Sequence, residues 1–180
     1  IAGAAVLSAV LALIGTQLSP IWRAVLIVLA VAVLGFTLYF FRDPERTPPS
    51  GEARERAVLA PADGKVVEIV DEPEPHYLKG PSTRVSIFLS PLDVHVNRIP
   101  ADGLIEFERY VPGDYLVAWH PKASEKNERS ELGLRHPSGY KVFFKQIAGA
   151  VARRIEYHVA EGDTVQAGER FGIVKFGSRM

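Results

Sequence analysis

The chain of 180 residues contains no cysteine, and its 21 basic and 21 acidic side chains give a formal net charge of zero. Without cysteine there can be no disulfide, zinc–thiolate site, iron–sulfur cluster or cysteine nucleophile, and the redox compartment cannot be deduced. Domains that hold nucleic acid by bulk charge are usually clearly basic, so zero net charge argues against a nucleic-acid partner.

Charge is also missing locally, because residues 1–41 contain a single charged side chain, Arg23. From Ala24 to Phe41 the chain has 18 consecutive uncharged residues, and Ile21 and Trp22 bring the apolar total to 20, with Arg23 between them able to reach toward the lipid headgroups. About 20 apolar residues cross a bilayer core. Trp22 and the aromatic residues at 39–41 stand where interfacial aromatics are expected.

A second apolar run, Ile1 to Gly15, precedes the turn-forming residues 16–20. We therefore predict a transmembrane helical hairpin over residues 1–41, with helices at about 1–18 and 21–41. A signal peptide and a buried helix pair are the alternatives, but a basic n-region and a small-residue cleavage site before Trp22 are missing. Arg42 and Arg46 follow the second run, which favours the cytoplasmic side of the inner membrane for the larger domain that comes after it.

After a Pro-rich connector at residues 42–57, short runs rich in Val, Ile, Phe or Tyr alternate with Gly, Pro and Asp. This pattern predicts a mainly β domain over residues 58–180, a compact sandwich or barrel. The predicted strands are Lys65–Val70, Arg84–Leu89, Leu104–Tyr110, Lys141–Ile147, Arg153–Val159 and Arg170–Phe176.

Two segments have a local meaning of their own. In Leu104–Tyr110, alternation places Ile105 and Phe107 on one face of a strand. The charged segment Pro121–Leu132 indicates a solvated loop or one helical turn, and a loop of this length beside a site can also be a lid.

The motif PADG occurs twice, at Pro61–Gly64 and at Pro100–Gly103, and an Asp-Gly pair between β runs is first a turn signal. Metal binding has almost no support, because the five histidines form no HxH or HxxxH pair. His95 is the histidine that stands out, since it follows an apolar run at a strand end, where scaffolds place reactive groups.

Four segments then occur in an order that resembles the phosphatidylserine decarboxylase family, in particular its short bacterial and archaeal type. They are LSPLDVHVNRIP at 89–100, NER at 127–129, QIAGAVARRI at 146–155 and FGS at 176–178. The resemblance covers about three quarters of the chain, from FFRDPERTPP onward, and implies a membrane-anchored enzyme made as a proenzyme.

The resemblance implies self-cleavage between Gly177 and Ser178, which converts Ser178 into a pyruvoyl group that forms a Schiff base with the substrate amine. His95 corresponds to the family's base and proton donor, and Asp63 to the acid that orients it. Some relatives carry a second histidine where this chain has Arg98, which could instead contact the substrate phosphate or carboxylate, or form a structural salt bridge. Asn127, Glu128 and Arg129 are further candidate substrate contacts.

The implied cofactor is thus a pyruvoyl group without a metal, and the implied partners are phosphatidylserine in the bilayer and the chain's own cleaved small fragment. The sequence leaves the oligomeric state open, a homodimer being one candidate. Family members continue for a few dozen residues beyond the Gly-Ser bond, so we expect the natural protein to extend past Met180. The alternative is a membrane-anchored lipoyl- or biotinyl-like module, a transporter adaptor or carrier, in which Lys65 would be the modified lysine.

Overall fold

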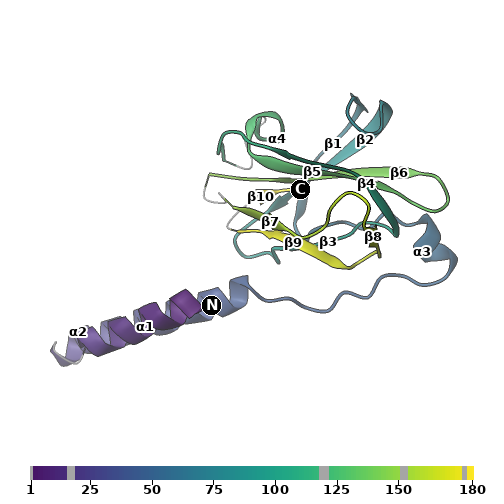
Figure 1. Ribbon diagram of the computed structural model, residues 1–180. Coiled ribbons are helices and arrows are strands. Elements are labelled where there is room, and N and C mark those ends of the chain that lie inside the picture. The colour runs from purple at the N-terminus through teal and green to yellow at the C-terminus, as the bar shows by residue number, and fades with distance from the viewer. Residues whose placement is uncertain (1, 16–18, 118–121, 151–153, 176–177) are drawn as a thin grey trace. The chain divides into compact units, whose positions relative to one another are not determined.

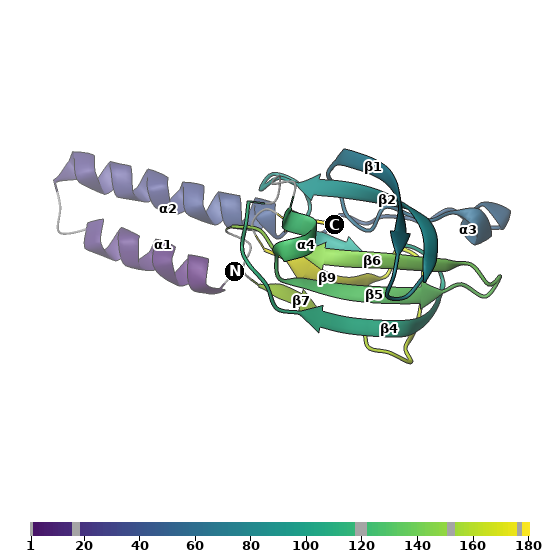
Figure 2. The ribbon, with the colours of Figure 1, turned by 90° about the horizontal axis from the view of Figure 1, so that it is seen from above.

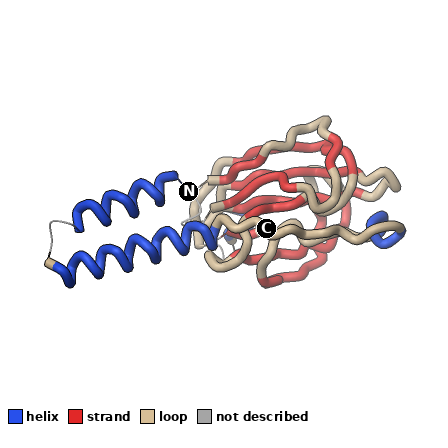
Figure 3. Tube along the Cα trace, turned by 90° about the horizontal axis from the view of Figure 1, so that it is seen from below, coloured by secondary structure: helices blue, strands red, loops and turns tan. Residues whose placement is uncertain are grey.

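The computed structural model describes residues 2–15, 19–117, 122–150, 154–175 and 178–180. Its contacts divide the chain into two units, Ile1–Asp43 and Pro44–Met180. All strands fall in the second unit, where they are red in Figure 3.

The first unit contains helices α1 (Ala2–Gly15) and α2 (Pro20–Phe40), and the Ser8 hydroxyl donates a hydrogen bond of 3.1 Å to the Ala30 carbonyl. Proline at the start of α2 is favoured, because the first helical N–H has no partner within the helix. Among the described residues, α2 is the one helix long and apolar enough to cross a membrane, with 21 residues and a mean hydropathy of 2.4. That α1 and α2 form a transmembrane hairpin stays a prediction.

The connector at 42–57 is extended through its prolines and then forms a short helix, α3 (Glu52–Arg56). Proline lacks an amide hydrogen and disfavours helical conformation in the preceding residue, which keeps residues 44–50 extended. The helix begins after the last proline of the segment, with Glu52 in its first turn and Arg56 in its last, as the helix dipole favours.

The second unit contains two antiparallel sheets, seen as two layers in Figure 1. The strands are β1 (Lys65–Glu74), β2 (Gly80–Leu89), β3 (Val96–Arg98), β4 (Gly103–Val111), β5 (Arg129–Arg135), β6 (Lys141–Ile147), β7 (Ile155–Tyr157), β8 (Thr164–Val165), β9 (Arg170–Val174) and β10 (Ser178–Arg179). The larger sheet has the order β1-β2-β10-β6-β5-β4-β8 and the smaller one β3-β9-β7.

The core lies between the two sheets, where Phe144 of β6 meets Phe171 of β9 edge-on at 5.3 Å between ring centroids. Figure 2 shows β4, β5 and β6 side by side with β9 behind them. The prediction of a mainly β unit is confirmed, and each of the six predicted strands overlaps an observed one. The barrel is not closed, since β1 and β8 are the two edges of the larger sheet in the described part of the chain.

The placement of Phe107 beside Ile105 on one face was wrong. Ile105 is fully buried in the core, but a β-bulge between it and Phe107 adds a residue, so that Phe107 pairs with Gly133 on the outer face. There Phe107 packs near Tyr77, from the turn between β1 and β2, at 6.0 Å between ring centroids. Tyr77 also covers Gly133, where a Cβ atom would lie 2.6 Å from its ring.

The charged segment before Leu132 was half correctly predicted. Residues Ala123–Lys126 form the expected helical turn, α4, but β5 begins at Arg129, and Ser130 and Glu131 are fully buried. The prediction of a solvated segment was wrong for Glu131, because its carboxylate is paired with basic side chains within the fold instead of being hydrated.

Candidate functional site

Ser178 begins the two-residue strand β10, which is inserted between β2 and β6. It pairs with Leu89, while Arg179 pairs with Ile147, and Met180 exchanges two backbone hydrogen bonds of 2.8 Å with β2. Residues directly opposite in a ladder share a face. The Ser178 side chain, 1% exposed, therefore faces the layer between the sheets, as the core residue Leu89 does. Gly177 lies outside the described residues.

His95 is held just beyond the end of β2 by a tight turn. Within it the Asp93 carboxylate accepts a 2.7 Å hydrogen bond from the Ser90 amide, and the Asp93 amide donates to the Ser90 carbonyl. The fully buried His95 ring has Nδ1 3.0 Å from the Asp93 carbonyl oxygen. A carbonyl oxygen only accepts, so Nδ1 carries the proton and Nε2 of a neutral ring has the lone pair that a base uses.

A buried polar bridge connects β3, which His95 directly precedes, with β6, which pairs with the strand of Ser178. Gln146 of β6 donates a 2.8 Å hydrogen bond to Asn97 of β3 and accepts one of 2.8 Å from Ser130 of β5. All three side chains are almost inaccessible to solvent. His95 stands two residues before Asn97, and Ser178 lies on the strand beside Gln146, so the bridge fixes β3 relative to the sheet that holds Ser178. Sequence reasoning missed this bridge, because its residues carry no spacing motif.

Asp63 forms an ion pair with Arg46 of the connector, and its side chain is 40% exposed. The segment before Asp63 is joined to the chain just after His95. The Arg98 amide donates to the Pro61 carbonyl and the Leu59 amide to the Pro100 carbonyl, both at 2.8 Å, so the two segments run antiparallel there. The orienting role of Asp63 stays a prediction.

Arg98 donates hydrogen bonds of 3.0 Å to two backbone carbonyl oxygens, those of Gly168 and Pro44. These bonds join β3 to the loop before β9 and to the start of the connector. A contact between Arg98 and substrate stays a prediction.

The predicted substrate contacts at 127–129 are largely engaged within the chain. Asn127 is fully buried and forms hydrogen bonds with both backbone groups of Leu116 and with the Ala148 carbonyl, at 2.7–2.9 Å. Glu128 accepts a hydrogen bond from the Tyr115 hydroxyl. In this structure these two side chains hold the 113–116 loop against the sheet.

Arg129 belongs to a charged cluster centred on Glu131, which is fully buried. Glu131 accepts hydrogen bonds from Arg129 and Arg109 and lies 3.4 Å from the Lys145 ammonium. Burial alone would raise the pKa of the Glu131 carboxyl, but these hydrogen bonds and the charge of Lys145 lower it below its usual value. The predicted substrate role of Arg129 remains untested beside this structural one.

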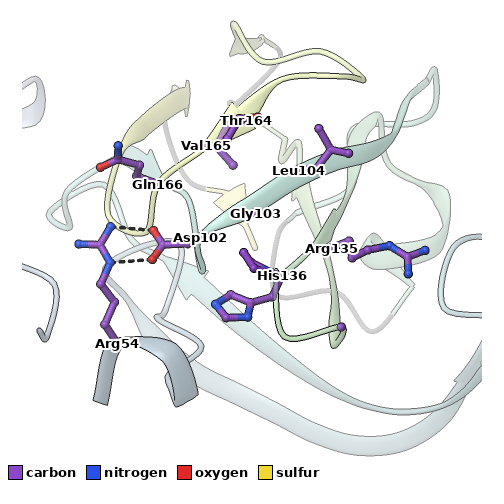
Figure 4. Close-up of a pocket in the computed structure, with 11 residues that line it drawn as sticks. Arg54, Asp102, Gly103, Leu104, Arg135, His136, Thr164, Val165 and Gln166 are labelled. Carbon is purple, nitrogen blue, oxygen red and sulfur yellow. Dashed lines mark hydrogen bonds and ion pairs between the residues drawn. The ribbon is translucent and has the colours of Figure 1, made fainter. Parts of the chain in front are cut away.

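A separate hollow of about 770 Å³ lies at the other end of β5, next to the second PADG turn (Figure 4). Arg54 donates hydrogen bonds of 2.6 and 2.7 Å to the two carboxylate oxygens of Asp102 on its wall. Its lining residues include Arg135 and His136 but none of the predicted catalytic residues. Arg135 is six residues along β5 from Arg129, so about 20 Å separates this hollow from the end where β10 lies.

Comparison with known proteins now identifies the family. The family profile described as phosphatidylserine decarboxylase matches residues 33–180. A phosphatidylserine decarboxylase proenzyme of Salinibacter ruber is 71% identical over 89% of this chain and 70% of its own length. The corresponding proenzymes of Chlorobium luteolum and Granulibacter bethesdensis are 46% and 50% identical, over 97% and 93% of this chain and 80% and 67% of their own lengths. The chain belongs to the phosphatidylserine decarboxylase family.

Membership in the phosphatidylserine decarboxylase family confirms the resemblance seen in the sequence and makes the chain one of a family of enzymes of phospholipid metabolism. The relatives are named proenzymes, which means that they are made as precursors. In the described part of the chain, no group of three or more His, Asp or Glu side chains could hold a metal ion. Lys65 stands at the first position of β1 rather than at the tip of a hairpin, which disfavours the carrier alternative.

Proposed function

We propose that this chain decarboxylates phosphatidylserine to phosphatidylethanolamine, using a pyruvoyl group made from its own Ser178. The observation that carries the proposal is the burial of Ser178 and His95, 1% and 0% exposed, beside two strands that one polar bridge connects: His95 directly precedes β3, and the strand of Ser178 pairs with β6. Both residues lie in segments that resemble the family's motifs, and relatives of the family are named phosphatidylserine decarboxylase proenzymes.

Self-cleavage would begin when His95 Nε2 removes the proton of the Ser178 hydroxyl, and the oxygen attacks the Gly177 carbonyl carbon. The peptide bond is thereby replaced by an ester. Loss of the Ser178 Cα proton then expels the Gly177 carboxylate and leaves a dehydroalanine. Its addition of water and release of ammonia give the pyruvoyl group at the head of the smaller chain.

The residues around position 178 fit such a group. Ser178 is the first residue of a strand that is paired on both edges, so a cut before it leaves the new chain end held by β2 and β6. The side chain already faces the enclosed layer between the sheets, from which water is excluded. A pyruvoyl group supplies an electron-withdrawing carbonyl that stabilises the carbanion left by loss of carbon dioxide.

His95 would serve a second time, by delivering a proton to the substrate carbon that has lost carbon dioxide. Its Nδ1–H bond to the Asp93 carbonyl fixes the ring, so that Nε2 can accept and then return the proton. We further propose that Asp63 supports the protonated ring from the turn before β1, and that residues 127–129 are the candidates for contacts with the polar headgroup.

For the membrane we propose that α2 spans the bilayer, paired with α1, with the β unit on the cytoplasmic side of the inner membrane. The length of α2, 21 residues, and its mean hydropathy of 2.4 support this, as do Arg42 and Arg46 just after it. Such an anchor suits a substrate that remains in the bilayer. The cleaved small chain and a second copy of the protein are the proposed protein partners.

The deciding experiment uses the full-length protein purified in detergent. We expect two chains by mass spectrometry, the smaller with a carbonyl-containing group at position 178 that hydroxylamine or borohydride modifies, and release of carbon dioxide from phosphatidylserine. Ser178→Ala and His95→Ala should each leave one uncut chain. An intact wild-type chain that releases no carbon dioxide would exclude the proposal, and normal cleavage in His95→Ala would assign the base elsewhere.

A further inference from the structure

The start of the connector is fastened to the β unit at several successive residues. The Pro44 carbonyl accepts a hydrogen bond from Arg98, Glu45 pairs with Arg170 at 2.9 Å, and Arg46 pairs with Asp63. Pro48 packs closely on Gly168, where a Cβ atom would lie 2.5 Å from the proline ring.

These contacts differ in strength, and the one made by Arg98 should dominate among the first three. The Arg46–Asp63 and Arg170–Glu45 pairs are well exposed, with side chains 40–85% accessible, and such pairs contribute little to stability. Arg98 is half-buried and uses a charged donor on two carbonyl oxygens, a class of hydrogen bond about twice as strong as one between neutral groups.

Pro44 is also the fastened residue nearest in sequence to the end of α2. Phe40 is the last residue of α2, and four residues of extended chain span at most about 14 Å. His95 precedes Arg98 by three residues, a span of at most about 11 Å. The Arg98 side chain therefore joins the strand next to His95 to the beginning of the chain that leads to α2.

We propose that Arg98 is a positioning residue that shortens the tether between α2 and the β unit, and so holds His95 within reach of the lipid headgroups. The inference rests on the proposed function, both the membrane anchor and the decarboxylation. When the Arg98 bond is absent, the next closely packed point is Pro48, so the free tether grows from four residues to eight. Effective concentration falls as about the −3/2 power of tether length, which predicts a loss of about threefold at the membrane.

The test compares two substrates for the full-length enzyme reconstituted in vesicles. One is long-chain phosphatidylserine in the same vesicles, and the other is water-soluble, short-chain phosphatidylserine. An eight-residue Gly-Ser insertion between Asp43 and Pro44 lengthens the free tether from four residues to twelve and leaves every described contact of the β unit intact. We expect it to lower the vesicle rate about fivefold and to change the short-chain rate less than about twofold.

The matched control places the same insertion between Pro49 and Ser50, after the fastened residues, and should leave both rates unchanged. Arg98→Met should lower the ratio of vesicle rate to short-chain rate about threefold, and Arg98→Lys less, because lysine lacks the fork that reaches two carbonyls. If Arg98→Met lowers both rates by the same factor, Arg98 acts on the substrate and the inference is wrong.

The inference is equally wrong if the two insertions behave alike, a result that does not depend on whether Arg98→Met folds. Absence of decarboxylation in the wild-type enzyme with either substrate would instead refute the proposed function itself.

Discussion

The tetrapeptide PADG occurs before β1 and before β4, and the two copies fold in the same way. A Cβ atom on Gly64 would lie 2.4 Å from the Phe88 carbonyl oxygen, and one on Gly103 would lie 2.3 Å from the Arg135 carbonyl oxygen. Each glycine lets its strand approach the neighbouring strand closely, and a β-bulge follows shortly in each. The same local sequence thus gives a similar close approach of the glycine backbone in both places.

The aspartates of the two turns differ in their partners. Asp63 pairs with Arg46 and is 40% exposed, while Asp102 is 28% exposed and receives two hydrogen bonds from Arg54 and a third from the Ala167 amide. Asp63 follows the segment that is hydrogen-bonded to residues 98–100, a few residues after His95, whereas Asp102 stands at the hollow remote from β10. The turn sequence sets the backbone, and the surroundings decide whether the carboxylate can serve catalysis or only stability.

The largest expected effect tests the close backbone approach that the two PADG turns share. Gly64→Ala and Gly103→Ala should each lower the free energy of unfolding by about 3 kcal/mol, because the added methyl meets a backbone oxygen that cannot move aside cheaply. Thermal unfolding of the full chain in detergent, followed by circular dichroism, measures the loss. Gly80→Ala is the control, since its Cβ would meet only a carbonyl oxygen at 3.9 Å. Tolerance at one turn and not at the other would show that the two backbones are not equivalent.

The second prediction tests the difference between the aspartates. Asp63→Asn should slow self-cleavage at least about 100-fold, because a positioned acid–base group contributes about that much, while Asp102→Asn should cleave at the wild-type rate. The fraction of uncut chain over time, separated on a denaturing gel, gives both rates. Normal cleavage in Asp63→Asn would make Asp63 a turn residue like Asp102, and would leave the Asp93 carbonyl as the group that orients His95.

Features set by neighbouring residues in the sequence could be predicted, and features set by distant parts of the chain could not. The runs that became β1, β2, β4 and β6 were predictable, because β-branched and aromatic residues between turn formers act locally. The place of β10 was not, since a two-residue strand is defined by its neighbours β2 and β6. Ser178 could be singled out only through the family's FGS motif.

Polar partners were the least predictable feature. Glu131 looked solvated in a charged segment, yet Arg109, Arg129 and Lys145 enclose it from three strands or strand ends. Such a cluster depends on strand register, and register in β4 is changed by a bulge that the alternation does not reveal. The same reasoning explains why Arg98, a plausible ligand for phosphate in the sequence, is bonded to two backbone carbonyls in the fold.

The smallest expected effect concerns pH and Asp102 alone. Hydrogen bonds from Arg54, opposed by partial burial, lower the pKa of Asp102 to about 2. A carboxyl whose pKa is lower in the folded state stabilises the fold above its unfolded pKa of about 4, and this contribution disappears as pH falls from about 4 to about 2. With a discount for exposure, this contribution to the free energy of unfolding amounts to about 1–2 kcal/mol.

Asp102→Asn should therefore unfold at a lower temperature than wild type at pH 6, and the difference between their unfolding temperatures should disappear toward pH 2. Arg54→Gln should remove the same contribution, and the double variant should lose no more than either single one. Additive losses would mean that the two side chains act independently, and that the ion pair drawn in Figure 4 does not hold this turn.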